Sequence, residues 1–486
     1  MDEVSRRELL KRGALAGVGA MALPGIDLLS PQASAAAPPP HLSDAAAAKL
    51  TGRAIRPNDA GYAQARRDWD RLFSHYPMAV VFCRNGQDVV NAISWARRRD
   101  VAVRVRSGRH SLEGWSNIDG GLVIDVSEMK RLHLDPATRT ATVGAGLTQG
   151  ELVARLGRGG FTIPTGSEAG VGIVGATLGG GFGFLTRAFG LACDNLLAVR
   201  IAVPAGRKGA KLITANRTNN SDLLWACRGG GGGNFGVVTS LTFRVHPIGK
   251  VAFLVAKWPD LSSLRAAFEA WQRTVPRADR RLSSVLEVDP TSFQMFAVLE
   301  SGTAEEARRL LRPVLDRGNP TVSVESKSWP AVFASFNGGP RSYDNWKFFS
   351  QFVSEPFPGR AIDIVQRYME RAPSPPSNFF CSSFGGKVRN APAGGSAFPH
   401  RDALFYAEPG AGWNGDGLTS KSQAWVAHFG QALRSYVSGA YVNVPNAGTA
   451  DWPRAYYGHN FARLRQVKSR YDPNDFFQFE QSIPPA

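Results

Sequence analysis

Residues 101–126 carry the pattern that most constrains the fold. Hydrophobic and polar residues alternate over residues 101–106, as they do in a β-strand with one buried face. Ser107-Gly108 follows as a tight turn, His110 comes directly after it, and the apolar run 122–126 predicts a second strand. Glycine reaches positive φ and lets an anion approach the backbone. The stretch therefore predicts either a phosphate-binding turn or an ordinary turn with an exposed histidine.

A second segment combines many glycines with large apolar side chains. Residues 171–183 interleave Val, Ile, Leu and Phe with glycine. Flexible linkers are typically rich in Gly and Ser and poor in such apolar residues. We interpret the segment as a packed loop that wraps a ligand, and the alternative is a flexible loop.

The length of the chain sets its domain organisation. At 486 residues it exceeds what one hydrophobic core ordinarily supports, which predicts two lobes. Within residues 250–435, strand-like runs such as 251–256 alternate with helix-like runs such as 261–273. This alternation favours an α+β lobe with one antiparallel sheet. Residues 385–399 and 408–417 are polar and rich in Gly and Pro, so both are expected to be loops.

The N-terminus has the features of a targeting segment. Arg6-Arg7 precedes a weakly apolar run at residues 13–23, and Ala33-Ser34-Ala35 offers a cleavage site. The alternative is an amphipathic helix of the fold, but the glycines of this run oppose it. We predict a twin-arginine signal peptide at residues 1–35, followed by a linker and lead-in at 36–75.

The formal charge of +17 raises the question of an anionic partner. A basic surface can bind nucleic acid, an anionic polymer or an anionic cell envelope. Apart from the cluster at residues 97–99 the basic residues are spread along the chain, and no nucleic-acid-binding motif is present. We expect a solvated basic surface and no nucleic-acid partner. No apolar stretch after the leader approaches the roughly 20 residues that span a bilayer, so no transmembrane segment is predicted in the mature chain.

Several reaction classes lack their usual residues. The chain has no P-loop, no H-E-x-x-H motif and no nucleophile elbow, so phosphoryl transfer, zinc hydrolysis and α/β-hydrolase chemistry are not expected. No metal site is predicted. Redox chemistry would require a cofactor. The cysteines are too few and too scattered for a disulfide framework and are expected to be buried free thiols: Cys83, Cys193, Cys227 and Cys381.

Two motifs carry a family resemblance. Residues 106–114, Arg-Ser-Gly-Arg-His-Ser-x-x-Gly, resemble the flavin-attachment loop of berberine bridge enzyme-like oxidoreductases, whose FAD domain is of the vanillyl-alcohol-oxidase type. Residues 456–477 and the final Gln-Ser-Ile-Pro at 481–484 resemble the C-terminal module of that family. The resemblance implies a two-lobed α+β fold, with a PCMH-type FAD-binding domain of two α+β subdomains and a substrate domain whose antiparallel sheet is covered by helices. The implied domains are the FAD-binding domain at 76–247, the substrate-binding domain at 248–438, and a module at 439–486 that returns to the FAD domain.

The same resemblance implies FAD as the cofactor, joined covalently to His110 through the 8α-methyl of its isoalloxazine. Some family members add a second bond from a cysteine, but Glu168 stands at that position here, so a single tether is expected. Val171 occupies the position where a small residue is associated with oxygen access, which favours an oxidase. The implied cofactor-binding residues are His110, Arg106, Ser107, Gly108, Arg109, Ser111, Gly114, Val171, Gly172, Gly175, Thr177, Gly179, Gly180, Gly181, Asn195, Gly236, Val238 and Asn460.

The resemblance also suggests a catalytic base. Family members often place a tyrosine beside the flavin within a Tyr-x-Asn-Tyr pattern, whereas this chain has Tyr441-Val-Asn followed by Val444. Tyr441 is therefore the candidate base, or else an ordinary strand aromatic, and its reference pKa of about 10 would need lowering or coupling to a stronger acceptor. Asn460 either contacts the flavin or caps a helix. Aromatic residues that line a ring-binding face or pack the core are Trp329, Phe333, Phe336, Tyr343, Trp346 and Phe348.

Together these features predict an exported, FAD-dependent oxidase that acts on a small molecule. Hydride would pass from an alcohol carbon of a saccharide or a secondary metabolite to covalently bound flavin, and molecular oxygen would be reduced to hydrogen peroxide. Two alternatives stay open: a flavin dehydrogenase that uses another electron acceptor, and a basic secreted binding protein without catalysis. The twin-arginine route would deliver the protein to the periplasm, the cell envelope or the medium, and no oligomeric state is predicted.

Overall fold

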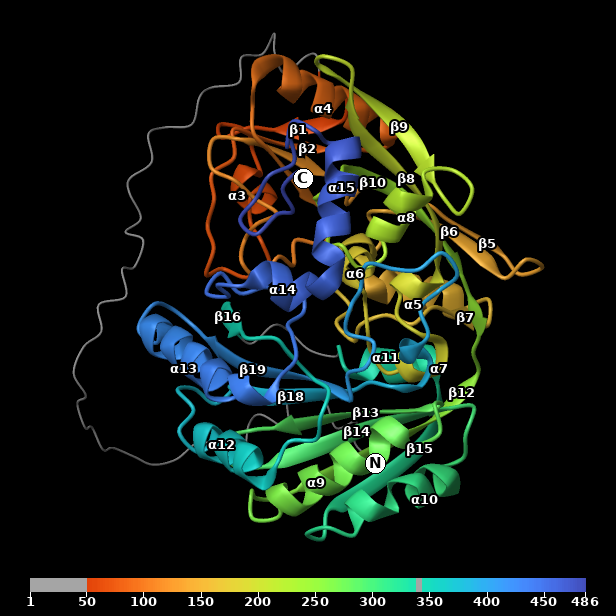
Figure 1. The fold of residues 1–486 in the computed structure, drawn as a ribbon, viewed down its shortest axis with the longest axis vertical. Coiled ribbons are helices and arrows are strands. Elements are labelled where there is room, and N and C mark those ends of the chain that lie inside the picture. The colour runs from red at the N-terminus through yellow and green to blue at the C-terminus, as the bar shows by residue number, and fades with distance from the viewer. Residues whose placement is uncertain (1–49, 338–342) are drawn as a thin grey trace.

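Two lobes stack along the long axis of the molecule in the computed structural model, which describes residues 50–337 and 343–486 (Figure 1). The predicted signal peptide, residues 1–35, lies outside the described residues. The first lobe contains residues 50–247 together with the C-terminal tail, and the second lobe is built from residues 250–438. Within the described part of the chain, no helix is long and apolar enough to cross a membrane.

A four-stranded sheet forms the N-terminal part of the first lobe. Its strands, in order across the sheet, are β1 (Arg53–Ile55), β2 (Ala79–Phe82), β4 (Leu122–Asp125) and β3 (Val103–Arg106). The side chains of β2 and β4 are all buried, as is typical of parallel strands covered on both faces. Helix α4 (Gly86–Arg99) begins after Asn85, whose side chain accepts hydrogen bonds from two backbone N–H groups of the first turn. The strands predicted on either side of the glycine turn are confirmed, and the lead-in contributes the short helix α3 (Tyr62–Ala65).

A five-stranded antiparallel sheet completes the first lobe. Its strands, in order, are β5 (Leu132–Asp135), β6 (Thr140–Gly144), β10 (Val237–Arg244), β8 (Leu196–Ala205) and β9 (Gly209–Ala215). Short helices join them: α5 (Gln149–Gly157), α6 (Ile173–Gly179), α7 (Thr186–Phe189), the 3₁₀ helix η1 (Cys193–Asn195) and α8 (Ser221–Ala226). The glycine-rich segment 171–183 was predicted to be a packed loop around a ligand; its packing is confirmed, but Ile173–Gly179 form a helix, and the contact with a ligand stays a prediction. The small pair β7 (Phe161–Thr162) and β11 (His246–Pro247) marks the passage to the second lobe.

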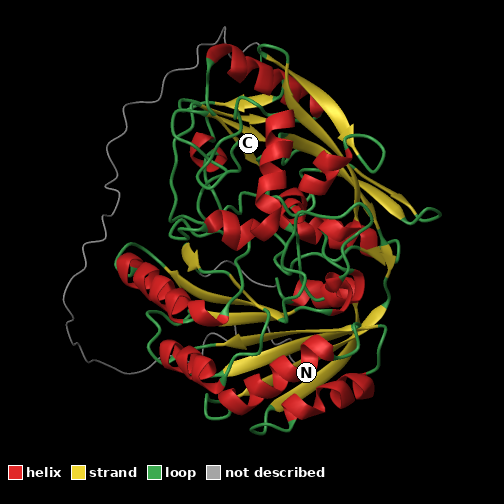
Figure 2. Ribbon diagram, viewed as in Figure 1, coloured by secondary structure: helices red, strands yellow, loops and turns green. Residues whose placement is uncertain are grey.

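An eight-stranded antiparallel sheet forms the second lobe. Across it run β15 (Thr321–Ser328), β12 (Lys250–Trp258), β14 (Phe293–Glu300), β13 (Leu282–Val288), β18 (Asn378–Ser383), β19 (Phe405–Trp413) and β16 (Asn345–Phe348), with β17 (Gln351–Val353) also paired to β19. Its outer face is covered by α9 (Leu264–Thr274), α10 (Ala304–Leu315), α12 (Gly359–Met369) and α13 (Thr419–Ala432) (Figure 2). Its inner face is turned toward the first lobe, next to α11 (Trp329–Ser335). The α+β class and the helix-covered antiparallel sheet are confirmed. Three 3₁₀ turns complete this lobe, η2 (Val275–Arg277), η3 (Gly386–Arg389) and η4 (Arg434–Tyr436).

The predicted loop at residues 408–417 is wrong over most of its length, because β19 continues to Trp413. Its glycines are needed inside the sheet, where β16 packs aromatic side chains over them. A β-carbon at Gly410 would lie 3.0 Å from the ring of Phe348, and one at Gly412 would lie 2.8 Å from the ring of Trp346. Glycine in a strand interior often marks such a close approach of a neighbouring group.

The C-terminal tail packs on the first lobe through α14 (Trp452–Tyr457), the 3₁₀ helix η5 (Gly458–Asn460) and α15 (Phe461–Tyr471) (Figure 1). Lys468 of α15 is fully buried, forms an ion pair with Asp472 at 2.7 Å and donates to the carbonyl oxygen of Asn234 at 2.8 Å. A buried ammonium needs such partners because the interior cannot solvate it. The tail is thereby fixed to the glycine-rich segment at residues 229–236. All four cysteines are free and buried, which confirms the expectation for them.

Candidate active site

The turn that carries His110 is fixed from behind by a buried arginine. Arg106, the last residue of β3, forms ion pairs with Asp125 at 2.8 Å and with Asp68 at 3.6 Å. Its guanidinium also donates to the carbonyl oxygen of Ala65 at 2.6 Å. These contacts direct the Arg106 side chain into the protein interior. Arg106 therefore stabilises the loop that carries His110 and does not project from it.

The turn itself touches the second glycine-rich segment. A β-carbon at Gly108 would lie 2.2 Å from the backbone nitrogen of Gly172, so only glycine fits there. Ser107 donates from its hydroxyl to the carbonyl oxygen of Ala145 at 2.8 Å, and Arg109 has a φ of 62°. The structure therefore brings together the two loops that the sequence predicts around a ligand.

His110 lies between the lead-in and the second loop. Its ring stacks on Trp69, with ring centroids 5.0 Å apart and an angle of 26° between the planes. The backbone N–H of Trp69 donates to the carbonyl oxygen of Arg109 at 2.8 Å. On the other side, a β-carbon at Gly170 would lie 2.9 Å from Nε2 of His110. Sequence reasoning missed Trp69, since it lies in a polar stretch with no motif of its own.

The second glycine-rich loop, residues 171–183, lies beside open space in which an elongated cofactor fits. A β-carbon at Gly175 would meet no atom within 4 Å, and one at Gly232 would meet only the Cα of Gly175, at 4.0 Å. The hydroxyl of Thr177 is buried and has no hydrogen-bond partner within residues 50–337 and 343–486. Open space between two glycine backbones, beside a hydroxyl that lacks a partner, suits the diphosphate and ring system of a dinucleotide cofactor.

The glycines at the C-terminal end of α6, residues 179–181, contact the predicted base or its neighbour Asn443. The backbone N–H of Gly181 donates to the hydroxyl oxygen of Tyr441 at 2.8 Å. A β-carbon at Gly179 would lie 2.0 Å from Oδ1 of Asn443, so this position also requires glycine. Asn443 donates from Nδ2 to Tyr441 at 2.9 Å and to the carbonyl oxygen of Ala176 at 2.8 Å. Asn443 is a site residue that the sequence analysis quoted only as part of a pattern.

Tyr441 lies in an aromatic cluster with Phe182, Phe352, Phe398 and Tyr406. Burial raises the pKa of its phenol well above the ordinary value, and the hydrogen bonds from Gly181 and Asn443 oppose this rise only in part. The phenol of Tyr441 is therefore protonated at neutral pH.

A half-buried carboxyl group, that of Glu408, lies beside this cluster. The hydroxyl of Tyr406 donates to Oε2 of Glu408 on β19, and the ring of Tyr406 lies 5.9 Å from the ring of Tyr441. Burial raises the pKa of the Glu408 carboxyl to about 7, while the hydrogen bond from Tyr406 acts in the opposite direction. A carboxyl group of this pKa can accept a proton near neutral pH. Sequence reasoning missed Glu408 because it lies in the segment that was expected to be a loop.

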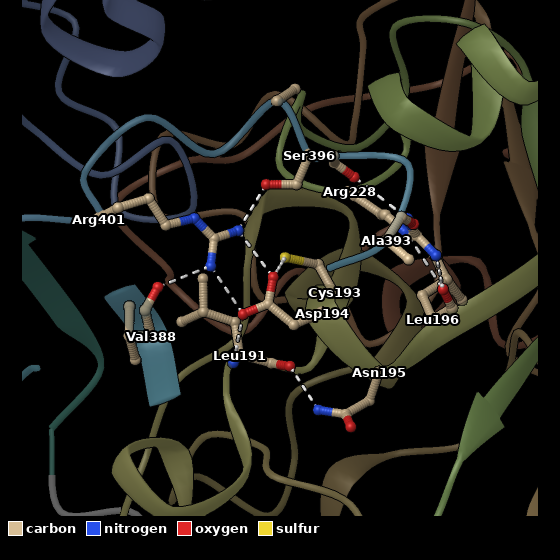
Figure 3. Close-up of polar contacts among 12 residues, drawn as sticks. Leu191, Cys193, Asp194, Asn195, Leu196, Arg228, Val388, Ala393, Ser396 and Arg401 are labelled. Atoms are coloured by element: carbon tan, nitrogen blue, oxygen red, sulfur yellow. Dashed lines mark hydrogen bonds and ion pairs between the residues drawn. The ribbon is translucent and has the colours of Figure 1, made fainter. Parts of the chain in front are cut away.

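The other predicted loop, residues 385–399, is confirmed apart from the 3₁₀ turn η3, and with the residues up to Arg401 it forms one wall of the site. The Asp194 carboxylate accepts two hydrogen bonds from Arg401, at 2.7 and 2.8 Å, and Arg228 donates to the carbonyl oxygens of residues 393 and 395 (Figure 3). The Asp194–Arg401 ion pair and the hydrogen bonds of Arg228 each join the first lobe to this segment. They hold the ring of Phe398 6.4 Å from the ring of Tyr441.

Other residues from the predicted cofactor set make contacts within the protein. Asn195 is buried, donates to two nearby carbonyl oxygens and faces Nε2 of His246 at 2.7 Å. A β-carbon at Gly236 would lie 2.4 Å from the carbonyl oxygen of Ala202, and Val238 lies in the core of the first lobe. Asn460 donates to the carbonyl oxygen of Ala397 at 3.1 Å.

The remaining predicted positions lie along the two loops. Ser111 continues the turn after His110, and Gly114 has a φ of 72° and packs on Phe73. The carbonyl oxygen of Val171 accepts from the backbone of Gln149 at 2.9 Å. Gly180 has a φ of 139°, and a β-carbon there would lie 3.3 Å from the Tyr441 ring.

Comparison with known proteins first defines the class of protein. Residues 77–208 match the FAD binding domain family, and residues 440–484 match the family described as berberine and berberine like. The first match contains the His110 turn and the second glycine loop, and the second contains Tyr441. Both domains are those of FAD-linked oxidoreductases of the berberine bridge enzyme-like class.

Relatives and solved structures then define the family. The chain is 38% identical to the uncharacterized FAD-linked oxidoreductase YgaK of Bacillus subtilis, over 90% of this chain and 98% of that protein. It is 40% identical to YvdP of the same organism, over 90% of this chain and 99% of that protein. The structure of Physcomitrella patens BBE-like 1 superposes with a TM-score of 0.84 at 29% identity, over 91% and 99% of the two chains. Glycopeptide hexose oxidase DBV29, solved in complex with teicoplanin, superposes with a TM-score of 0.81 at 27% identity, over 89% and 99%. The chain belongs to the berberine bridge enzyme-like family of FAD-linked oxidoreductases.

Proposed function

We propose that the protein is an oxidase that removes hydride from an alcohol carbon of a small molecule, with oxygen as the electron acceptor and hydrogen peroxide as the product. Bound FAD supplies the hydride acceptor. The observation that carries the proposal is the hydrogen-bonded Tyr406–Glu408 pair, which lies beside Tyr441 and the glycine loop. An alcohol carbon gives up hydride readily only if its hydroxyl loses a proton, so the site needs a base at this place.

Glu408 is the better candidate for that base. The hydroxyl oxygen of Tyr441 already accepts from Gly181 and Asn443, and burial keeps its phenol protonated. Glu408 has a pKa of about 7, and Tyr406 can pass a proton to it through their hydrogen bond. In this arrangement the alcohol proton goes to the Tyr406–Glu408 pair, and Tyr441 holds the position of the glycine loop.

A single covalent tether through His110 belongs to the same proposal. Trp69 fixes the histidine ring, and Gly108 and Gly170 leave room for the two loops to approach each other. Some relatives have a second attachment cysteine. Glu168 stands at that position in this chain and provides no thiol. A tethered cofactor suits a protein that leaves the cytoplasm, and we propose export through the twin-arginine route.

Peroxide detection tests the oxidase proposal against the dehydrogenase alternative. Purified protein is screened with alcohols under air and, in parallel, without oxygen in the presence of an electron-accepting dye. An oxidase produces hydrogen peroxide in amounts equal to the alcohol consumed, and the dye adds little to the rate. Turnover with the dye and none with oxygen would select the dehydrogenase.

A further inference from the structure

Two basic clusters that are far apart in the sequence meet at one end of the first lobe. Residues 97–99 are the last three residues of α4, and the turn between β8 and β9 carries two more bases. Arg97 is buried and donates to the carbonyl oxygens of Ala205, at 3.1 Å, and Gly209, one on each side of that turn. These hydrogen bonds hold the β8–β9 hairpin against the end of α4 (Figure 1).

Most of the positive charge in this region is exposed and is not neutralised by carboxylates. The exposed cations of the two clusters and of the neighbouring strand are Arg98, Arg99, Arg207, Lys208 and Lys211. Lys208 pairs with Asp100 at 2.6 Å, and none of the others forms an ion pair within residues 50–337 and 343–486. The helix dipole favours bases at the C-terminus of α4, but it does not account for those of the hairpin. Because like charges held together repel each other, a bound anion would stabilise this arrangement.

A hollow of about 390 Å³ opens beside these cations. Its walls come from the hairpin, from the end of α4 and from the end of α15. Lys211 and Arg470 line it, and Arg470 forms an ion pair with Asp222 at 2.9 Å while its side chain stays mostly exposed. Asp472 also lines the hollow, but its carboxylate is buried and paired with Lys468. The lining therefore keeps an excess of positive charge.

The exposed side chains of this region offer charge and no large apolar surface. In the part of the chain that the structure describes, the large hydrophobic side chain that is exposed is Tyr76, which lies before β2. Proteins that bind single-stranded nucleic acid stack its bases on aromatic side chains, and helices that insert into a membrane surface use exposed apolar ones. A flat lipid surface would also not reach the walls of the hollow, whereas a flexible chain can enter it. The region therefore suits a chain of phosphate groups that carries no bases.

We propose that the end of α4, the β8–β9 hairpin and the end of α15 bind a flexible anionic polymer that carries a phosphate on each repeating unit. The five exposed cations contact phosphates at the rim, and Arg470 contacts one in the hollow. Figure 1 shows α4 and β9 at the end of the first lobe that lies away from the second lobe, so the bound polymer leaves the active site accessible. The inference does not depend on the proposed oxidation.

Binding of dye-labelled, long-chain inorganic polyphosphate to the FAD-loaded protein tests the proposal. Fluorescence anisotropy gives the association constant at several salt concentrations between about 0.05 and 0.2 M. Bound cations displace the counterions of the polymer, so the logarithm of the association constant falls linearly with the logarithm of the salt concentration. A slope of about −0.7 for each phosphate contacted in a flexible chain gives an expected slope of about −4 for this surface.

The test variant combines four changes at exposed bases: Arg98→Gln, Arg99→Gln, Arg207→Gln and Lys211→Gln. We expect its affinity to fall about tenfold or more at the lowest salt concentration, and its salt slope to shrink to about −1. The matched control combines Arg308→Gln, Arg309→Gln, Arg312→Gln and Arg317→Gln, which are exposed bases in and just after α10. The control loses the same net charge, but its arginines are interspersed with acids, so its affinity should stay within about threefold of the unchanged protein.

The hairpin alone gives a second test, since Arg207→Gln combined with Lys211→Gln should reduce the salt slope by about 1.4. Visible flavin absorption of each purified variant shows that its fold is retained. Absence of polyphosphate binding at low salt, or equal losses in the test and control variants, would overturn the proposal. Tighter binding of a single-stranded oligonucleotide of equal charge would overturn it too, as would binding to phosphatidylglycerol vesicles without binding to polyphosphate.

Discussion

Two groups near the glycine loop, the buried phenol of Tyr441 and the half-buried carboxyl of Glu408, have different roles in the site. Tyr441 accepts hydrogen bonds from Gly181 and Asn443, and its protonated phenol fixes the loop on which they lie. Glu408 lies in an apolar surrounding that raises its pKa to about 7, with Tyr406 as its hydrogen-bond donor. Tyr441 thus fixes the glycine loop, and Glu408 exchanges a proton.

Replacing the carboxyl group tests this division. We expect Glu408→Gln to lower kcat/KM by about 10² to 10⁴, the usual contribution of a positioned base. In the unchanged enzyme only the ionised carboxylate accepts a proton, so kcat/KM should fall about tenfold per pH unit as the pH drops below about 7. Steady-state kinetics across roughly pH 5 to 9 measures both effects.

Glu325→Gln is the control for this experiment, because Glu325 lies half-exposed on the edge strand β15. It should leave both the rate and the pH profile unchanged. If Glu408→Gln kept the fall in rate below pH 7 and Tyr441→Phe removed it, Tyr441 would be the base after all.

Site residues could be predicted from the sequence where they belong to a short motif. His110 follows the glycine turn directly, and Tyr441 is part of a recognisable pattern. Glu408 and Trp69 could not be predicted, since each owes its place to partners far away in the sequence. No local spacing connects Glu408 to the rings of the first lobe.

Composition predicted two loops and is wrong about one of them. Residues 385–399 and 408–417 are rich in Gly and Pro, which predicts loops. The first segment is a loop with one 3₁₀ turn, η3, whereas β19 occupies the second up to Trp413. In β19 the glycines make room for aromatic rings of β16. Segment 385–401 is held as a wall by Arg228 and by the Asp194–Arg401 pair. By contrast, α4 and the strands beside the His110 turn follow their local hydrophobic pattern and were predicted correctly.

Breaking the buried ion pair should loosen this wall. Asp194→Ala leaves the Arg401 guanidinium buried without its carboxylate partner, which typically costs about 3 to 5 kcal/mol. We expect a lower free energy of unfolding of the FAD-loaded enzyme in urea and faster cleavage of segment 385–401 by added protease. Asp316→Ala removes a pair with Arg312 that is largely exposed, and should change stability by less than about 1 kcal/mol. Equal effects of the two variants would show that the buried pair does not hold the wall.

At the scale of the whole molecule, the two lobes are locked together by buried charges. Arg187 of the first lobe donates to carbonyl oxygens of the second lobe, among them Phe384 at 3.0 Å and Ala278 at 2.9 Å. Lys347 of the second lobe forms an ion pair with Glu113 near the His110 turn. Such contacts fix the position of the two lobes relative to each other.

Export can be tested by changing the paired arginines of the leader. Replacing Arg6 and Arg7 together by lysine should keep most of the protein inside the cell, because the twin-arginine route reads this pair. The measurement is the fraction of flavoprotein found outside the cytoplasm. The same replacement at Arg98 and Arg99, which lie in α4, leaves the leader intact and should not change that fraction. Unchanged export after the change at Arg6 and Arg7 would contradict the proposal.

The most direct test of the whole account is the behaviour of the flavin in acid. Purified mature protein is precipitated with acid, and the visible absorption of pellet and supernatant is recorded. A covalent bond through His110 predicts a yellow pellet for the unchanged protein and yellow supernatant for His110→Ala. Release of the colour from the unchanged protein would show that FAD is bound without the His110 linkage, and a colourless protein purified from flavin-replete cells would contradict the site itself.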